Sequence, residues 1–274
     1  MPELAATIHA SAVIEGDVTI GDDVVIGPHC VLDGTLGPVG IGDGCHLIAN
    51  CYLSGPLTMG RANTVWPAAS LGGPPQDVEW NPSEPGAGLI IGNHNTFRES
   101  FTGHRAKTEE PTRIGNHNFF MACSHVGHDS QVGNHIQMAN SAALGGHVTV
   151  GDRVIMGGGA AIHQFCRIGE GAFMQGHAGA SVDIPPWCIS RDINRIAGMN
   201  LIGMRRSGMA REDIARRRAV YRIIYRSDLG MPEVIKRLRS DGDPIAVEYA
   251  DFIEQSERGI CHDRDPASRH RSSD

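Results

Sequence analysis

The sequence predicts a mainly β fold, a parallel β-helix built from six-residue repeats. The first observation is an apolar residue that recurs at every sixth position. The second is composition: Gly is abundant at 35 of 274 residues, aromatic residues make up 5% and charged residues 20%. Such a composition is typical of a β-rich chain with many tight turns. The longest run in one frame consists of Ile114, Phe120, Val126, Val132, Met138, Leu144, Val150, Met156, Ile162, Ile168, Met174 and Ala180.

A period of six fits neither of the ordinary secondary structures. A helix would space its apolar residues by three and four, and a half-buried strand would alternate strictly. The period instead fits a short strand followed by a turn, with one large side chain per segment directed inward. Three segments of six would close a triangular coil of 18 residues, and successive coils would stack about 4.8 Å apart. Each coil would cover the strand edges of the one before it.

The N-terminal part keeps the same rhythm. In many repeats Gly directly follows the apolar residue, as at Gly27, Gly115 and Gly133. We expect these glycines to supply the backbone angles of a sharp corner. The repeats here start at Ile8, Ile14, Ile20, Ile26 and Leu32, and again at Ile41, Leu47, Leu53, Met59, Val65 and Leu71.

Two segments interrupt the repeat and predict loops that project from the prism. Residues 72–90 are rich in Pro, Gly and acidic residues, and residues 104–113 form a shorter break. A β-helix does not need such loops, and loops on a rigid scaffold often carry function.

The repeat stops after Ala180, and the remainder becomes helical. Helical patterns cover 211–227, 231–240 and 244–255, and the last residues are polar. We therefore predict a β-helix over 1–190, a C-terminal helical domain over 191–260 and a disordered tail over 261–274.

Composition also bounds the functional class. The net charge of −7 argues against nonspecific nucleic-acid binding. Seven Cys without a CxxC pair indicate reduced thiols, and neither a signal peptide nor a membrane-spanning stretch is evident. We expect a cytoplasmic protein that is not an integral membrane protein.

The 18-residue coil places distant residues side by side. His128, Gly146 and Gln164 are 18 apart and fall in one column. The break at 104–113 adds five residues to the frame, and correcting for them places His104 beside His128. The predicted stripe consists of His104, His125, His128, Gly146, His147, His163 and Gln164.

Three interpretations of this stripe are open. A single His on such a face is most often a solvated surface residue. Clustered His also ligate zinc, but no two His here are five residues apart, the spacing seen in the zinc-holding γ-class carbonic anhydrases of similar fold. The favoured interpretation is general base catalysis, in which a neutral His takes a proton from an alcohol that attacks a carbonyl. Gly146 would offer a backbone N–H to the oxyanion. No GxSxG or Cys-centred motif indicates a covalent nucleophile. We expect direct acyl transfer without a metal or a cofactor.

Several segments resemble the acyl-[acyl-carrier-protein]–UDP-N-acetylglucosamine O-acyltransferase family. They are RESFTGHR (98–105), ACSHVGHDSQVGN (122–134), LGGHVTV (144–150), AAIHQFCRIG (160–169) and VDIPPWCI (182–189). The likeness extends from the first residues to about Gly259. It implies a left-handed β-helix, a homotrimer with active sites between subunits, and the first step of lipid A biosynthesis. The implied reaction moves an (R)-3-hydroxyacyl chain from acyl carrier protein to the 3-hydroxyl of UDP-N-acetylglucosamine.

The resemblance also implies roles for individual residues. The catalytic His falls on His128, with Asp129 as the adjacent orienting acid and Gly146 as the oxyanion donor. Gly176 falls on a position that measures acyl length, where a small residue leaves room for a longer chain. Substrate-contacting positions fall on Asp77, His104, His125, His147, His163, Gln164, Asn200 and Arg206.

A basic segment fits the implied donor. Eight Arg lie between 205 and 226 in an otherwise acidic chain, and a solvated helix face is the alternative interpretation. Acyl carrier protein is acidic, so a basic surface would speed its encounter and weaken in salt. We predict that salt, or charge reversal at Arg216–Arg218, raises the Michaelis constant for the carrier protein.

The chain departs from the family pattern at Glu79, Ile202 and Ser207. The acceptor therefore stays open between UDP-N-acetylglucosamine and its 3-amino analogue. Two other functions also stay open. One is an acyl-CoA-dependent transferase acting on another sugar or amine, and the other is a noncatalytic trimeric scaffold.

Overall fold

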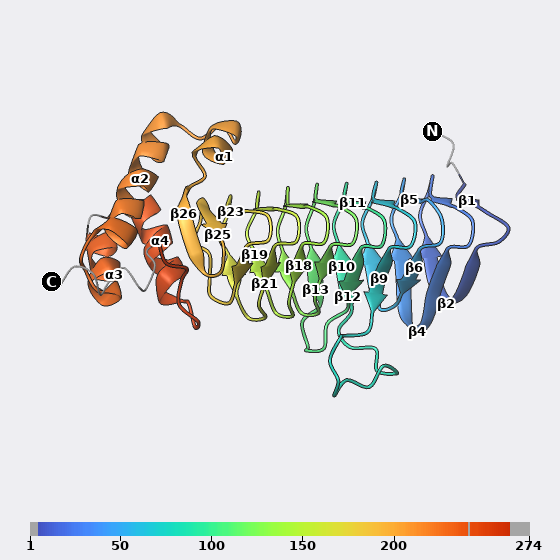
Figure 1. The fold of residues 1–274 in the computed structure, drawn as a ribbon. Helices are drawn as coiled ribbons and strands as arrows, with labels where there is room; N and C mark the ends of the chain where they lie inside the picture. Colours follow the sequence, from blue (N-terminus) through green and yellow to red (C-terminus); the bar gives the residue numbers. More distant parts are fainter. Residues whose placement is uncertain (1–4, 241, 264–274) are drawn as a thin grey trace.

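The computed structural model describes residues 5–240 and 242–263, which form a long triangular prism capped by helices (Figure 1). The predicted parallel β-helix of hexapeptide repeats with a helical C-terminus is confirmed. Its left-handed sense rests on the family resemblance. Short strands pair in parallel from coil to coil, and the blue N-terminal coils lie at the end opposite the orange and red helices (Figure 1).

One face of the prism is an 11-stranded sheet. Every pair in it is parallel except the last, which is antiparallel. In spatial order its strands are β1 (Thr7–Ile8), β3 (Val25–Ile26), β5 (His46–Leu47), β8 (Thr64–Val65), β11 (Thr96–Phe97), β14 (Phe119–Phe120), β17 (Gln137–Met138), β20 (Ile155–Met156), β23 (Phe173–Met174), β25 (Cys188–Arg191) and β26 (Arg195–Met199).

A 15-stranded sheet supplies the other two faces. It bends around the prism because β4 (Val31–Ile41) pairs through its first residues with one arm and through its last residues with the other. Along one arm lie β7 (Leu57–Met59), β10 (Leu89–Ile91), β13 (Thr112–Ile114), β16 (Gln131–Val132), β19 (Thr149–Val150) and β22 (Arg167–Ile168). The other arm holds β6 (Tyr52–Ser54), β9 (Ser70–Gly73), β12 (Thr102–His104), β15 (His125–Val126), β18 (Ala143–Leu144), β21 (Ala161–Ile162) and β24 (Gly179–Ala180), and β2 (Val13–Ile20) pairs with β4.

The strand register confirms the predicted 18-residue coil. His125 pairs with Ala143, which pairs with Ala161. All twelve residues of the long apolar run are at most 5% exposed and belong to one continuous core. The exceptions to the predicted burial are Ile8 and Ile14, which are 45% and 39% exposed, and Ile20, which is only partly buried. They lie in the first coil, which has no preceding described coil to cover it.

The expected reason for the repeat glycines was wrong. Gly27, Gly115 and Gly133 do not have positive φ angles. These positions leave no room for a side chain, because neighbouring coils approach closely. A Cβ on Gly27 would lie 1.8 Å from the Ile48 carbonyl oxygen. Left-handed angles occur instead at the second turn residue, as at Asp129 (φ 62°) and His147 (φ 59°). Non-Gly residues rarely adopt such angles, so the stacked coils must stabilise them.

Four helices follow the prism: α1 (Leu201–Arg206), α2 (Arg211–Arg226), α3 (Met231–Ser240) and α4 (Pro244–Glu254). The last three coincide with the predicted helices to within one residue at either end. The repeat analysis missed α1 and the antiparallel strand β26. Helices α2, α3 and α4 share a small apolar core that includes Val220, Val234 and Tyr249.

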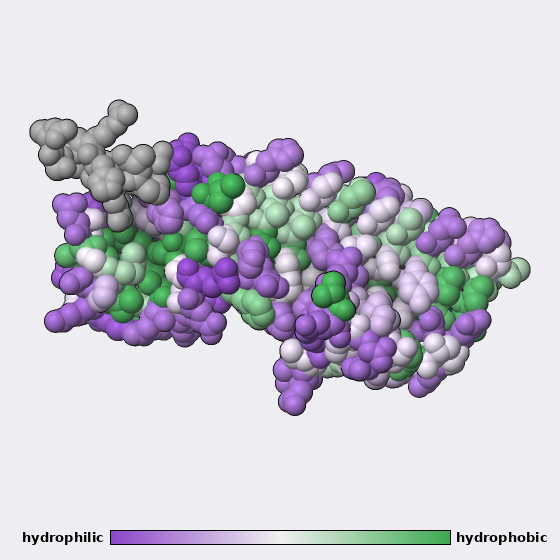
Figure 2. All heavy atoms as spheres, turned by 60° about the horizontal axis from the view of Figure 1, so that its bottom comes forward, coloured by the Kyte–Doolittle hydropathy of each residue, from purple (hydrophilic) through white to green (hydrophobic). Residues whose placement is uncertain are grey.

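The C-terminal residues 261–263 lie against the prism rather than in the predicted tail. Cys261 is fully buried, and its backbone N–H donates to the Asp183 carbonyl at 2.8 Å. The rest of the predicted tail, 264–274, lies outside the described residues. No helix in the described part of the chain is long and apolar enough to cross a membrane. The face in Figure 2 is mainly hydrophilic, with apolar side chains in small groups.

Candidate active site

The predicted histidine stripe lies along one edge of the prism, where the two arms of the 15-stranded sheet meet. Each turn there has two outward residues, and turns on successive coils stack. His128, Gly146 and Gln164 are the first residues of three such turns, as the spacing predicted. Asp129, His147 and Phe165 are the second residues, each with a positive φ angle. Backbone hydrogen bonds fix the stack, since the His147 N–H donates to the His128 carbonyl at 2.9 Å.

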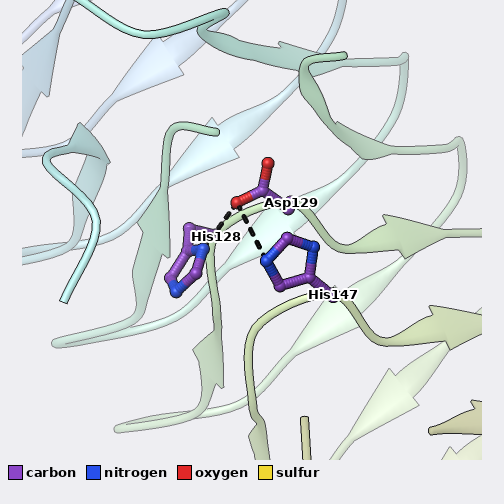
Figure 3. A group of neighbouring side chains, drawn as sticks. All are labelled: His128, Asp129 and His147. Carbon is purple, nitrogen blue, oxygen red and sulfur yellow. Dashed lines mark hydrogen bonds and ion pairs between the residues drawn. The ribbon is translucent and has the colours of Figure 1, made fainter. Parts of the chain in front are cut away.

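His128 and Asp129 form the centre of the site (Figure 3). The Nδ1 atom of His128 lies 2.5 Å from Oδ2 of Asp129. An ionised carboxylate only accepts, so this contact assigns the ring proton to Nδ1 and leaves the Nε2 lone pair available as a base. The side chains are 13% and 3% exposed, so both groups are mostly shielded from water.

Asp129 is held by donors from the neighbouring loop. Thr108 donates to Oδ1 through its backbone N–H at 2.9 Å and its hydroxyl at 2.5 Å, and the Lys107 N–H donates to Oδ2 at 3.1 Å. Burial raises the pKa of Asp129, but the hydrogen bonds from His128, Thr108 and Lys107 outweigh it and hold the pKa well below its usual range. Asp129 is therefore a fixed negative charge that orients the imidazole.

Gly146 lies directly against the His128 ring. A Cβ on Gly146 would be 2.8 Å from both Cε1 and Nε2 of His128, closer than real Cβ contacts. Within the described residues the Gly146 N–H donates to no other group. Only Gly lets the ring rest on this turn, with a backbone donor beside it.

His147 borders the same carboxylate. Its Nε2 is 3.6 Å from Oδ2 of Asp129, and its ring meets the His128 ring edge-on at 5.2 Å between centroids (Figure 3). On its other side it stacks on Phe165 at 4.4 Å. Desolvation lowers the pKa of His147, and the nearby Asp129 only partly offsets this.

His104 and His125 form the adjoining part of the stripe. Their ring centroids are 5.2 Å apart, and Gly103 pairs with Val126, which places His104 where the frame correction predicted. The Thr102 hydroxyl lies 2.8 Å from Nδ1 of His125, and Nδ1 of His104 lies 2.5 Å from the Pro74 carbonyl oxygen. Burial lowers the pKa of both rings, that of His125 to about 4, so both are neutral at pH 7.

Asp77 reaches the site from the long loop between β9 and β10. The Lys107 ammonium donates to its Oδ2 at 2.6 Å, and this contact is the largest cause of a lowered Asp77 pKa. His163 and Gln164 lie one coil beyond Gly146 and are exposed, with Nδ1 of His163 3.0 Å from the Gln164 carbonyl oxygen.

Three predicted site residues lie elsewhere in the protomer. Gly176 is in a turn between β23 and β24, at a different edge of the prism. Asn200 and Arg206 line a pocket of about 450 Å³ against the 11-stranded sheet. Asn200 also caps α1: its Oδ1 accepts from Gly203 N–H at 2.9 Å, and its Nδ2 donates to the Gly171 carbonyl at 2.9 Å.

Repeat reasoning missed Lys107, Thr108 and Phe165. Phe165 follows His147 by 18 residues, so the same arithmetic could have found it. Lys107 and Thr108 lie in the irregular loop, where no periodicity predicts position.

The geometry fits a base better than a metal centre. Among the described residues, one group of His, Cys, Asp and Glu is close enough to converge on an ion, namely His128, Asp129 and His147. Zinc ligands at about 2.0–2.2 Å from an ion stand more than 3 Å apart in a tetrahedral site, and the 2.5 Å contact of His128 with Asp129 is a hydrogen bond instead.

Comparison with known families agrees with the fold and the motifs. Residues 183–261 match the family described as "Udp N-acetylglucosamine O-acyltransferase; Domain 2". Residues 5–34 match "Bacterial transferase hexapeptide (six repeats)".

Full-length relatives share one name. The acyl-[acyl-carrier-protein]–UDP-N-acetylglucosamine O-acyltransferase of Thermodesulfovibrio yellowstonii is 38% identical over 259 residues, covering 93% of this chain and 98% of that protein. The namesake from Syntrophobacter fumaroxidans is 35% identical and covers 92% and 98%. Among solved structures, the UDP-N-acetylglucosamine acyltransferase from Campylobacter jejuni superposes with a TM-score of 0.87 at 32% identity, covering 94% and 100%. The chain therefore belongs to the acyl-[acyl-carrier-protein]–UDP-N-acetylglucosamine O-acyltransferase family.

Proposed function

We propose that this protein transfers an (R)-3-hydroxyacyl chain from acyl carrier protein to the 3-hydroxyl of UDP-N-acetylglucosamine, with His128 as the general base. The observation that carries the proposal is the His128–Asp129 pair, whose basic Nε2 lies against Gly146. Family membership supports the reaction, and the product would enter lipid A biosynthesis. We place the reaction in the cytoplasm, where acyl carrier protein and nucleotide sugars are made.

The site supports a direct transfer. Nε2 of His128 takes the proton from the sugar hydroxyl as its oxygen attacks the thioester carbonyl. The Gly146 N–H donates to the oxyanion of the tetrahedral intermediate. When this intermediate collapses, the C–S bond breaks and the imidazolium returns the proton to the departing thiolate. Asp129, kept ionised by its hydrogen bonds, stabilises the imidazolium that forms in between.

The remaining substrate contacts support a site shared between subunits, and the family resemblance implies that the assembly is a homotrimer. Asn200, Arg206 and Gly176 lie on other faces than His128, so within one protomer they do not share its site. We infer that the pocket lined by Asn200 and Arg206 faces the histidine stripe of a neighbouring subunit. Asp77, His104, His125, His147, His163 and Gln164 would contact substrate from the subunit that provides His128.

Mixed trimers test this assembly. We expect light scattering to give three chains per particle. His128→Ala and Arg206→Ala proteins should each be inactive, while co-expressed mixtures should regain part of the activity because some interfaces combine both native residues. Failure of mixtures of stable trimers to regain activity would contradict a shared site.

The carrier protein would dock on α2. Arg218 and Arg222 are exposed, form no ion pair within the described residues, and line a pocket of about 260 Å³ with Tyr221. Two residues of the predicted basic surface form ion pairs within the protein instead. Arg217 is 8% exposed and donates to both Glu248 oxygens at 3.1 and 3.0 Å, while Arg216 pairs with Asp213 and Asp243.

The reaction itself is tested by acyl transfer from 3-hydroxyacyl carrier proteins of several chain lengths. UDP-N-acetylglucosamine is the acceptor, and its 3-amino analogue and acyl-CoA serve as comparisons. We expect turnover with the carrier-protein donors and the hydroxyl acceptor. Turnover restricted to acyl-CoA or to the amino sugar would contradict the proposed substrates.

A further inference from the structure

The loop between β9 and β10 projects from the prism and returns to it (Figure 1). It spans residues 74–88 and carries Asp77, yet it has no helix of its own and only one bridge to another segment. A loop of this length loses much conformational entropy when it is held in one arrangement. Something must therefore fix it.

The side chain of Arg105, a residue outside the loop in sequence, reaches carbonyl groups in the middle of the loop. The residue is 1% exposed, and its guanidinium donates to two loop carbonyls, Pro82 at 3.1 Å and Glu84 at 3.0 Å. It also donates to the Gly72 carbonyl at the end of β9, at 2.9 Å. No carboxylate pairs with Arg105 among the described residues, and burial lowers its pKa. A buried cation that bonds only carbonyls is costly to desolvate, so it indicates a specific structural requirement.

The backbone around Arg105 joins both ends of the same loop. Its own N–H donates to the Gly73 carbonyl at 3.0 Å, where the loop begins. The next N–H, of Ala106, donates to the Gly88 carbonyl at 3.0 Å, where the loop ends. Together with the guanidinium contacts to Pro82 and Glu84, Arg105 and Ala106 thus hold the loop at both ends and in its middle.

The segment 104–108 continues from this loop to the catalytic pair. His104 contacts the Pro74 carbonyl, and Lys107 binds Asp77. The Lys107 and Thr108 N–H groups then hold the Asp129 carboxylate. One short segment thus connects the loop that carries Asp77 to the acid that orients His128.

We infer that Arg105 is a positioning residue that keeps the 74–88 loop closed beside the histidine stripe, so that Asp77 is preorganised to bind the sugar nucleotide. We call the hydrogen bonds of Arg105 to this loop the clamp. The inference rests on the proposed function for the identity of the substrate, but the existence of the clamp does not. Preorganisation saves ordering cost at the moment of binding. Losing the clamp should therefore weaken substrate binding more than the chemical step.

Two variants test the clamp, one by changing Arg105 and the other by changing the loop that it holds. Arg105→Met removes the guanidinium. Gly86→Ala perturbs the loop, because Gly86 has a φ of 61° and a Cβ there would lie 2.1 Å from the Ala106 carbonyl oxygen. Arg98→Met is the matched control: Arg98 precedes the same segment, but it is partly exposed and pairs with Glu99.

Loop order is measured by the rate of endoproteinase Glu-C cleavage after Glu79, which lies inside the loop and is followed by Trp80. We expect Arg105→Met and Gly86→Ala to raise that rate about tenfold or more, with little change in the melting temperature, because the loop lies outside the β-helix core. The KM for UDP-N-acetylglucosamine should rise about tenfold while kcat stays within about threefold. Arg105→Lys should be intermediate, and Arg98→Met should match the unaltered protein.

Each outcome bears on the inference. Unchanged cleavage in both variants overturns the clamp, and faster cleavage with an unchanged KM overturns the positioning role. If Arg105→Met does not fold, Gly86→Ala decides alone. If even the unaltered protein fails to turn over UDP-N-acetylglucosamine, the proposed function fails, whereas the cleavage rates still judge the clamp.

Discussion

The close contact between His128 and Gly146 makes the site depend on glycine at position 146 as well as on histidine at position 128. Any side chain at 146 would meet the ring, since even a Cβ would lie 2.8 Å from Nε2. The ring would have to swing away from the Gly146 N–H, the proposed oxyanion donor.

Gly146→Ala should therefore lower kcat by about 10²-fold, the size of effect seen when a positioned base or oxyanion donor is lost. Steady-state kinetics with saturating substrates measure it. Gly158→Ala is the control, because Gly158 occupies the same position of another turn and a Cβ there would have only ordinary contact, at 3.6 Å. Full activity in Gly146→Ala would mean that His128 does not act from this position.

The neutral imidazoles make stability depend on pH. Burial lowers the pKa of His125 to about 4, whereas an unfolded His has a pKa of about 6.5. Between these values the unfolded state binds more protons, so this contribution to stability is complete above pH 6.5 and is lost as pH falls toward 4.

We expect thermal unfolding to show a fall in stability from pH 7 to pH 5, with His125 contributing up to about 2 kcal/mol. The His125→Asn variant should show a shallower dependence on pH over this range. An identical dependence in both proteins would contradict a buried neutral His125.

At the scale of the elements, close approach between coils limits where side chains are tolerated. The Cβ of an alanine at 27 would overlap the Ile48 carbonyl, whereas one at Gly40 would have its nearest neighbour at 4.0 Å. We predict that Gly27→Ala destabilises the protein by about 1–3 kcal/mol and that Gly40→Ala is neutral within about 0.5 kcal/mol. Urea unfolding compares the two, and equal stabilities would refute the close-packing explanation.

The exposed arginines of α2 provide the second prediction at this scale. Reversing charge at Arg218 and Arg222 should raise the KM for acyl carrier protein about tenfold at low salt, and added salt should narrow the difference. The KM for UDP-N-acetylglucosamine should not change. Arg217→Glu is not an equivalent test, because it would leave Glu248 facing a second carboxylate and destabilise α2 against α4. If neither the charge reversal nor added salt changes the KM for acyl carrier protein, α2 is not part of the docking surface.

For the whole molecule, the six-residue period was sufficient to predict the solenoid and half of the site. A fixed 18-residue coil makes sequence position equivalent to spatial position, so the column of His128, Gly146 and Gln164 followed from counting. The same counting could not place Arg105, Lys107 or Thr108, because loop conformation depends on individual hydrogen bonds. Nor did it bring Arg206 to the stripe, since within the protomer Arg206 lies against the 11-stranded sheet instead.

The most direct test of the proposed mechanism is acyl transfer by His128→Asn in the full assembly. Calorimetry would measure UDP-N-acetylglucosamine binding by the same protein. The account predicts that the variant binds the nucleotide sugar with an affinity close to that of the unaltered protein, while kcat falls by about 10²-fold or more. A variant that binds normally and transfers the acyl chain within a few-fold of the normal rate would contradict His128 as the general base.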